Sequence, residues 1–221
     1  MMKDRAGVVG GNGVAPLVQQ LVNAGDARVH LIGHSYGAKV VLSAVASANG
    51  LTRPVDSVLL LQPAISAYSF ADNVPGAGGP GKYRVAVDAS RVRQPVFCTF
   101  SENDWPLTQI FHLFVNRRRD LGEAAPAAAA PAVAAAPAPP PNDFAALGGF
   151  GPQPLPPQPG TGGEVAWVFL RDEGERYSAK SGNRVIGLRN RGQQIACHGC
   201  VSNGHTWWAL WNQVAGVPVG Q

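Results

Sequence analysis

A serine lies between two glycines in the segment Gly33-His34-Ser35-Tyr36-Gly37. Residues 28–32, just before it, form a short apolar run rich in branched side chains, which is typical of a buried strand. Residues 38–48, just after it, carry small and apolar side chains at helical spacing. A tight strand-to-helix turn would project the Ser35 hydroxyl above a sheet as a nucleophile. The backbone N–H of Tyr36, at the start of the helix, is then the candidate oxyanion donor.

A serine nucleophile needs a general base, and the base needs an acid to orient it. Asp104 is the preferred acid, because it closely follows a predicted strand over 95–100. The alternative is that Asp104 caps the helix that follows, since aspartate is a favoured N-cap. Glu102 is a second candidate acid. Asp72 and Asp88 also follow Ser35 in the chain, but neither comes after a convincing strand end.

Five histidines are candidates for the base. His205 is preferred because it follows a glycine and opens the final aromatic segment, and His198, before Gly199 and Cys200, is its main rival. His30 lies inside the predicted strand and His112 inside a predicted helix, so both are expected to be packing or surface residues. His34 lies beside Ser35 and is expected to line a substrate pocket.

Two tryptophans are further pocket candidates, Trp105 beside Asp104 and Trp207 beside His205. Trp207, Trp208 and Trp211 have a spacing that also suits simple packing of a C-terminal helix onto a sheet. Cys197 and Cys200 form a C-x-x-C pair. A zinc site would usually need a second such pair, so a local disulfide or two free thiols is favoured over metal.

The segment Leu31–Ala38 resembles the nucleophile elbow of α/β-hydrolase esterases and lipases. In that family the catalytic residues follow the chain order serine, acid, histidine, which here implies Ser35, Asp104 and His205. The resemblance implies a serine carboxylesterase that cleaves small to medium esters without a metal or organic cofactor. Amidases, peptidases and lactonases share the same residues, and a non-catalytic binding or scaffold module is the alternative outside enzymes.

The expected fold is α/β, with a short, mostly parallel sheet flanked by helices, because predicted strands alternate with helical segments. The expected strands, in chain order, are 28–32, 58–61, 95–100, 165–170 and 184–188. Residues 7–13 contain four glycines and are expected to form a loop before a helix that starts near Pro16.

The segment 124–160 differs from the rest, because it holds more than half of the 19 prolines, with alanine runs between them. Such a composition favours polyproline conformation or disorder. We therefore expect a hydrolase core over 1–123, a flexible insertion over 124–160, and the rest of the core over 161–221.

Ser35 comes early for this family, whose nucleophile strand usually follows several others. Either the sequence is N-terminally truncated, or the protein is a minimal variant covered by a partner chain, or Gly10-Gly11-Asn12-Gly13 replaces the usual oxyanion loop with its own backbone N–H groups. An open sheet edge invites pairing with another chain, so a homodimer is one expectation.

Composition narrows the choice of partners. The net charge is +4, and apart from Arg117–Arg119 the basic residues are dispersed, with no basic stripe interleaved with aromatics, so nucleic acid is not an expected partner. The sequence contains no apolar run of 18 residues, so a membrane span is not expected. No signal peptide is visible, which favours the cytoplasm. The expected partner is a small ester substrate.

Overall fold

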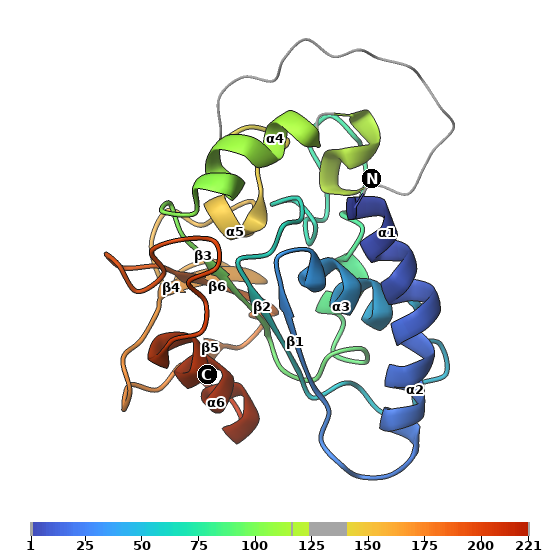
Figure 1. Ribbon diagram of the computed structural model, residues 1–221. Coiled ribbons are helices and arrows are strands. Elements are labelled where there is room, and N and C mark those ends of the chain that lie inside the picture. The colour runs from blue at the N-terminus through green and yellow to red at the C-terminus, as the bar shows by residue number, and fades with distance from the viewer. Residues whose placement is uncertain (1, 116, 124–140, 221) are drawn as a thin grey trace.

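The computed structural model describes residues 2–115, 117–123 and 141–220. Its main feature is a five-stranded parallel sheet with the strand order β1-β2-β3-β6-β4 (Figure 1). The strands are β1 His30–His34, β2 Ser57–Leu61, β3 Val96–Phe100, β4 Val165–Phe169 and β6 Val185–Arg189. A separate parallel pair joins β5 Ala179–Lys180 to β7 Val219–Gly220. The predicted α/β class with a short parallel sheet is confirmed.

Helices cover both faces of the sheet and the space beyond the carboxyl ends of its strands (Figure 1). One face carries α1, α2 and α3, the other carries α6, and α4 and α5 lie beyond the strand ends. The bounds are α1 Met2–Val8, α2 Ala15–Asn23, α3 Tyr36–Ser47, α4 Phe111–Phe114, α5 Leu147–Phe150 and α6 Gly204–Ala215. Shorter helical turns are Val9–Val14 and Pro106–Ile110, both of the π type, and Arg84–Val87 and Arg118–Glu123, both 3-10.

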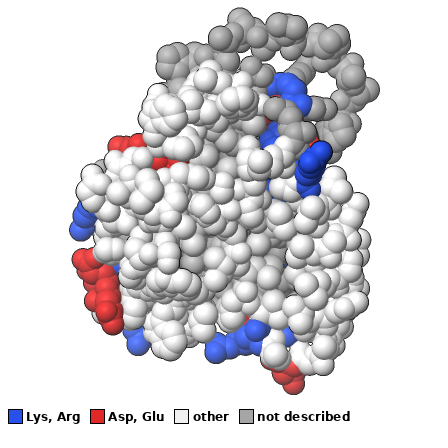
Figure 2. Space-filling view, in the orientation of Figure 1, with Lys and Arg blue, Asp and Glu red and all other residues white. Residues whose placement is uncertain are grey.

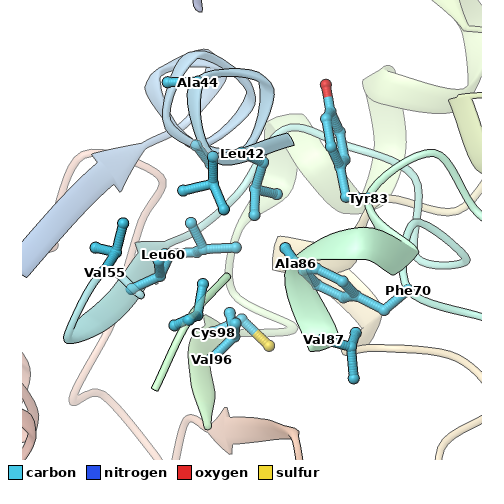
Figure 3. Packing of buried hydrophobic residues seen from close by; sticks show 14 of the residues in the cluster. Leu42, Ala44, Val55, Leu60, Phe70, Tyr83, Ala86, Val87, Val96 and Cys98 are labelled. Carbon is cyan, nitrogen blue, oxygen red and sulfur yellow. The ribbon is translucent and has the colours of Figure 1, made fainter. Parts of the chain in front are cut away.

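The core forms because the strands are apolar on both sides. Leu60 and Cys98 face the α3 side, where they pack with Leu42 (Figure 3). Their chain neighbours Leu59 and Phe97 face the α6 side. Strand side chains alternate between the two faces of a sheet, so a continuous apolar run is buried only when both faces are covered. Full burial of one such leucine contributes about 2 kcal/mol.

The prediction of a loop over 7–13 is wrong. These residues belong to a nearly continuous helical segment, in which α1, a π-helical turn and α2 follow one another. The glycines serve close packing, because a Cβ on Gly10 would lie 2.3 Å from the Val40 carbonyl oxygen of α3. Gly10 therefore allows two helices to approach closely, and the proposed use of 10–13 as an oxyanion loop is not supported by this conformation.

The prediction of a flexible segment over 124–160 is wrong for 141–160, and 124–140 lies outside the described residues. Ala146 bridges Ser66 in antiparallel fashion, and Leu147 is fully buried in the main core. The Leu147 backbone N–H donates to the Ile65 carbonyl at 2.8 Å. Contacts with neighbouring apolar and backbone groups thus order this part of the proline-rich segment, which includes the short helix α5. The boundaries at 123 and 161 stay a prediction.

The nucleophile strand β1 forms one edge of the sheet, and β4 forms the other (Figure 1). Ile32, at the centre of β1, is 43% exposed. This exposure is compatible with a partner along β1, and the homodimer stays a prediction.

Candidate active site

Ser35 occupies a strained turn between β1 and α3. Its backbone has φ 55° and ψ −125°, a conformation that costs about 1–3 kcal/mol for a residue other than glycine. Hydrogen bonds hold the turn: the Ser35 N–H donates to the Leu61 carbonyl at 3.1 Å, and the Ala64 N–H donates to the Ser35 carbonyl at 3.1 Å. The neighbouring strand β2 therefore fixes the position of the serine.

The two glycines around Ser35 are not equivalent. A Cβ on Gly33 would lie 2.6 Å from the Gly37 carbonyl oxygen, so the turn requires glycine there. A Cβ on Gly37 would meet no atom within 4 Å. Of the two glycines, Gly33 alone is therefore needed to make room for the turn.

His198 lies between Ser35 and Asp104. Its Nε2 is 2.8 Å from the Ser35 Oγ, and its Nδ1 is 2.8 Å from Asp104 Oδ2. The structure thus corrects the choice of histidine, because His205 is instead paired with Asp172, at 2.9 Å. The physical reason is that His198 lies in the loop after β6, whereas His205 is the second residue of α6 and lies partly exposed on that helix.

The sequence carried a signal that separates the two histidines. Asn203 caps α6: its side-chain oxygen accepts from the Thr206 N–H at 3.1 Å. Asparagine is a preferred N-cap, so His205 could have been assigned to a helix and His198 to the loop that follows a predicted strand.

Asp104 is fully buried, and it acts both as the partner of the histidine and as a cap for the helical turn that follows it. One carboxylate oxygen, Oδ2, is paired with His198, and the other, Oδ1, accepts from the Leu107 N–H at 3.0 Å at the start of the next helical turn. The alternative acid Glu102 is exposed and paired with Arg189. Asp72 forms an ion pair with Arg84. Asp88 accepts the Ser90 N–H.

Sequence reasoning missed Gln62, which immediately follows β2. Its Nε2 donates to Asp104 Oδ2 at 2.9 Å and to the Gly148 carbonyl at 3.1 Å. Its Oε1 accepts from the Thr99 hydroxyl at 3.0 Å, and its backbone has φ 41°. Gln62 is wholly buried, so its hydrogen bond helps to hold the Asp104 carboxylate in one orientation. Its place at the end of a buried strand was the available signal.

Tyr36 begins α3, so its backbone N–H is at the positive end of the helix, one residue after Ser35. Its side chain packs against a small apolar cluster that includes Leu107 and Phe111. The tyrosine therefore joins the serine turn to the segment that follows Asp104. The oxyanion role of its N–H stays a prediction.

His34 contacts the histidine loop. Its Nε2 is 2.8 Å from the His198 carbonyl oxygen, and the two imidazole rings have centroids 4.9 Å apart. His30 and His112 lie on β1 and α4, and burial lowers the pKa of each. Of the five histidines, His198 is the one whose ring meets the hydroxyl of Ser35.

The two candidate pocket tryptophans lie at different places. Trp105 follows Asp104 directly and is 63% exposed. Trp207 lines a hollow on α6 together with His205, Glu173 and Trp211, and none of the three residues Ser35, His198 and Asp104 lines it. A pocket role for Trp207 beside the serine is therefore not supported.

Cys197 and Cys200 are joined in a disulfide on either side of His198. Their sulfurs are therefore not thiolate ligands, and the local disulfide is the alternative that the structure selects. Within the described residues, no group of three or more His, Cys, Asp or Glu side chains is arranged to hold a metal ion.

Charged side chains on the face seen in Figure 2 occur in small groups around its margin, and most of the described surface there is uncharged. The dense basic surface that nucleic acid needs is not seen on this face. The absence of a nucleic-acid partner stays a prediction.

The whole arrangement, with a serine turn after β1, an acid after β3 and a histidine after β6, can be compared with known families. Residues 8–210 match the alpha/beta hydrolase family. The chain belongs to this family. No curated protein and no solved structure matches the chain. In the described part of this alpha/beta hydrolase, no helix has the length and apolar character needed to cross a membrane.

Proposed function

We propose that this alpha/beta hydrolase is a serine carboxylesterase that forms an acyl-enzyme on Ser35. The supporting observation is the hydrogen-bonded series from the Ser35 Oγ through His198 to Asp104, with both links at 2.8 Å. These distances suit proton transfer between nucleophile and base. The His198 side chain is 24% exposed, so an ester in solution can reach the pair.

The first half of the reaction transfers the acyl group. His198 Nε2 accepts the Ser35 proton as Oγ attacks the ester carbonyl, and the same nitrogen then protonates the leaving alkoxide. Asp104 accepts the Nδ1–H, which fixes the tautomer and stabilises the imidazolium. The Tyr36 N–H donates to the developing oxyanion at the start of α3.

The second half releases the acid. Water replaces the alcohol and attacks the acyl carbonyl while His198 removes its proton. The tetrahedral intermediate then collapses, the bond between the acyl carbon and the Ser35 Oγ breaks, and His198 returns the proton to the Ser35 Oγ. Because Asp104 is fully buried and receives the Gln62 amide, it keeps its orientation through both halves.

The segment that follows Asp104 carries exposed apolar side chains, and we expect this segment to bind the acyl chain of the ester. Trp105, Leu113 and Phe114 are 63%, 49% and 60% exposed along the segment that follows Asp104. Exposed apolar side chains grouped beside a reactive site are typical of a substrate-binding surface.

The test is hydrolysis of p-nitrophenyl acetate and butyrate by the wild type, by Ser35→Ala and by the control Ser47→Ala, which replaces the exposed last residue of α3. We expect turnover by the wild type and by Ser47→Ala, and none above background by Ser35→Ala. Fluorophosphonate labelling of the three proteins should follow the same pattern, because it needs an activated serine but no particular substrate.

Other outcomes would change the proposal. If the folded wild type neither turns over nor labels, the protein is a non-catalytic module. If it labels but cleaves a panel of amides, peptides or lactones faster than the esters, the same residues serve a different hydrolase reaction.

A further inference from the structure

His198 is enclosed by a covalent ring. The segment Cys197-His198-Gly199-Cys200 is closed by the disulfide, and within it the Cys200 N–H donates to the Cys197 carbonyl at 3.1 Å. The backbone conformation of the histidine is thus restricted on both sides by one crosslink.

The ring lies between two anchored points of the chain. Before it, Ile195 is fully buried, and its carbonyl accepts the Ser101 hydroxyl at 2.9 Å. After it, the Asn203 side chain donates to the Cys200 carbonyl at 2.9 Å. These contacts fix where the loop enters and leaves, whereas the disulfide restricts the conformation of the histidine itself.

Both sulfur-bearing residues are exposed, while His198 is partly buried. Exposed disulfides are the ones that thiols reach and reduce readily. The remaining cysteine, Cys98, is fully buried in the core, and burial raises the pKa of its thiol. A dithiol in solution therefore has one accessible target in this chain.

We propose that the Cys197–Cys200 disulfide positions His198, and that a dithiol reductant lowers the activity by opening it. One thiolate of the dithiol attacks a ring sulfur, the S–S bond breaks, and a mixed disulfide forms. The second thiol of the reductant then displaces the protein sulfur, which leaves two cysteine thiols and an oxidised reductant. Two electrons and two protons pass from the reductant to the protein.

The consequence for activity rests on the proposed function. With the ring open, His198 keeps its contacts to Ser35 and Asp104 for only part of the time. A misplacement of about 1 Å in a catalytic group can lower the rate by about 100-fold, so we expect kcat to fall by about 10- to 100-fold. KM should change little, because no substrate-binding group is altered.

The experiment compares the oxidised and the dithiothreitol-reduced full chain, with the thiol count of each checked by mass spectrometry under non-reducing conditions. The direct readout is the low-field proton NMR signal of the His198 Nδ1–H hydrogen-bonded to Asp104, assigned by its loss in His198→Ala. The kinetic readouts are kcat and KM for p-nitrophenyl butyrate, and the rate of fluorophosphonate labelling.

Two variants serve as controls. Cys197→Ser/Cys200→Ser should start with the reduced enzyme's low kcat and not respond to dithiothreitol. Cys98→Ala should respond like the wild type. Reoxidation should restore the wild-type NMR signal and kcat. A protein that had unfolded on reduction would not recover both fully.

The proposal predicts that the NMR signal broadens or disappears on reduction, whether or not the protein is an esterase. Retention of the signal, or an unchanged kcat in protein shown to carry three thiols, would overturn it. A lack of fluorophosphonate labelling in the oxidised protein, with the NMR signal still sensitive to reduction, would instead remove the proposed function and leave the positioning role standing.

Discussion

Two histidine–aspartate pairs use histidines that lie near each other in the sequence, His198 and His205, but the surroundings of the two pairs differ. The His198–Asp104 and His205–Asp172 pairs have nearly the same separation, 2.8 and 2.9 Å. The Asp104 side chain is 0% exposed, whereas that of Asp172 is 72% exposed. The first pair meets Ser35, whereas the histidine of the second pair lies on α6 and lines a hollow together with Trp207.

The comparison shows that a hydrogen-bonded pair is not by itself a site. A carboxylate out of water interacts more strongly with an imidazolium, because the local dielectric is lower. It also keeps a single orientation when other donors hold it, as Gln62 and the Leu107 N–H hold Asp104. Water competes for Asp172, so its pair with His205 is expected to contribute little.

The largest expected difference is between the two histidines. His198→Ala should lower kcat for p-nitrophenyl butyrate by roughly 10⁶-fold, since a serine without its base is a weak nucleophile. His205→Ala should keep wild-type kcat. Steady-state kinetics of both variants, with circular dichroism to check folding, measures the difference. Equal losses in the two variants would contradict the assignment of the base.

The two aspartates should differ by a smaller factor. Asp104→Asn should lower kcat by roughly 10⁴-fold, because the amide favours the wrong imidazole tautomer. Asp172→Asn should lower it less than about 2-fold, as expected for an exposed pair. Activity of an Asp104→Asn variant close to that of the wild type would show that His198 does not depend on the buried carboxylate.

Gln62 tests whether the buried aspartate needs a second hydrogen bond besides the one from its histidine, because the Gln62 side chain also donates to Asp104. Gln62→Leu should remove one donor from the carboxylate and lower kcat by about 10-fold, with KM unchanged. The thermal midpoint of the variant should be measured beside the kinetics, since Gln62 also bonds Thr99. A folded variant with unchanged kcat would make Gln62 a structural residue alone.

The smallest expected effect is on the stability of the protein at acid pH, and it comes from Asp120, which belongs to neither histidine–aspartate pair. Burial raises the pKa of Asp120, but its hydrogen bonds to Arg117 and Lys3 outweigh this effect and hold the pKa below the ordinary 3.8. A depressed pKa in the folded state stabilises the protein above the unfolded value, and this contribution is lost as pH falls through the folded value. Asp120→Asn should therefore cost about 1–2 kcal/mol near neutral pH.

The pH dependence distinguishes this ion cluster from a simple packing contact. Urea unfolding of the wild type and of Asp120→Asn should show a stability difference that narrows as pH falls below the ordinary pKa of aspartate. A difference that stays constant down to that range would mean that the charge of Asp120 does not contribute.

The sequence predicted well those features that are local in the chain. Apolar runs identified β2 and β3 to within a residue, and the acid was predicted from its place after β3. The turn at Ser35 was predicted from the apolar run that contains the start of β1. The histidine was missed because the helix start signalled by Asn203 was not recognised, and because the pairing of His198 with Asp104 depends on how the chain folds back between β6 and α6. Two predictions from composition also failed. The glycines around Gly10 belong to a helical segment because they pack closely on α3, and the proline-rich segment is ordered at Leu147 because this residue packs into the core. Gln62 was missed because its partners are distant in sequence.

If His198 activates Ser35, a fluorophosphonate should modify Ser35 only when this histidine is present, and mass spectrometry can map the modified residue. The wild type, His198→Ala and His205→Ala should be treated side by side. We expect rapid labelling at Ser35 in the wild type and in His205→Ala, and none above background in His198→Ala. Labelling that survives in His198→Ala and is lost in His205→Ala would contradict it.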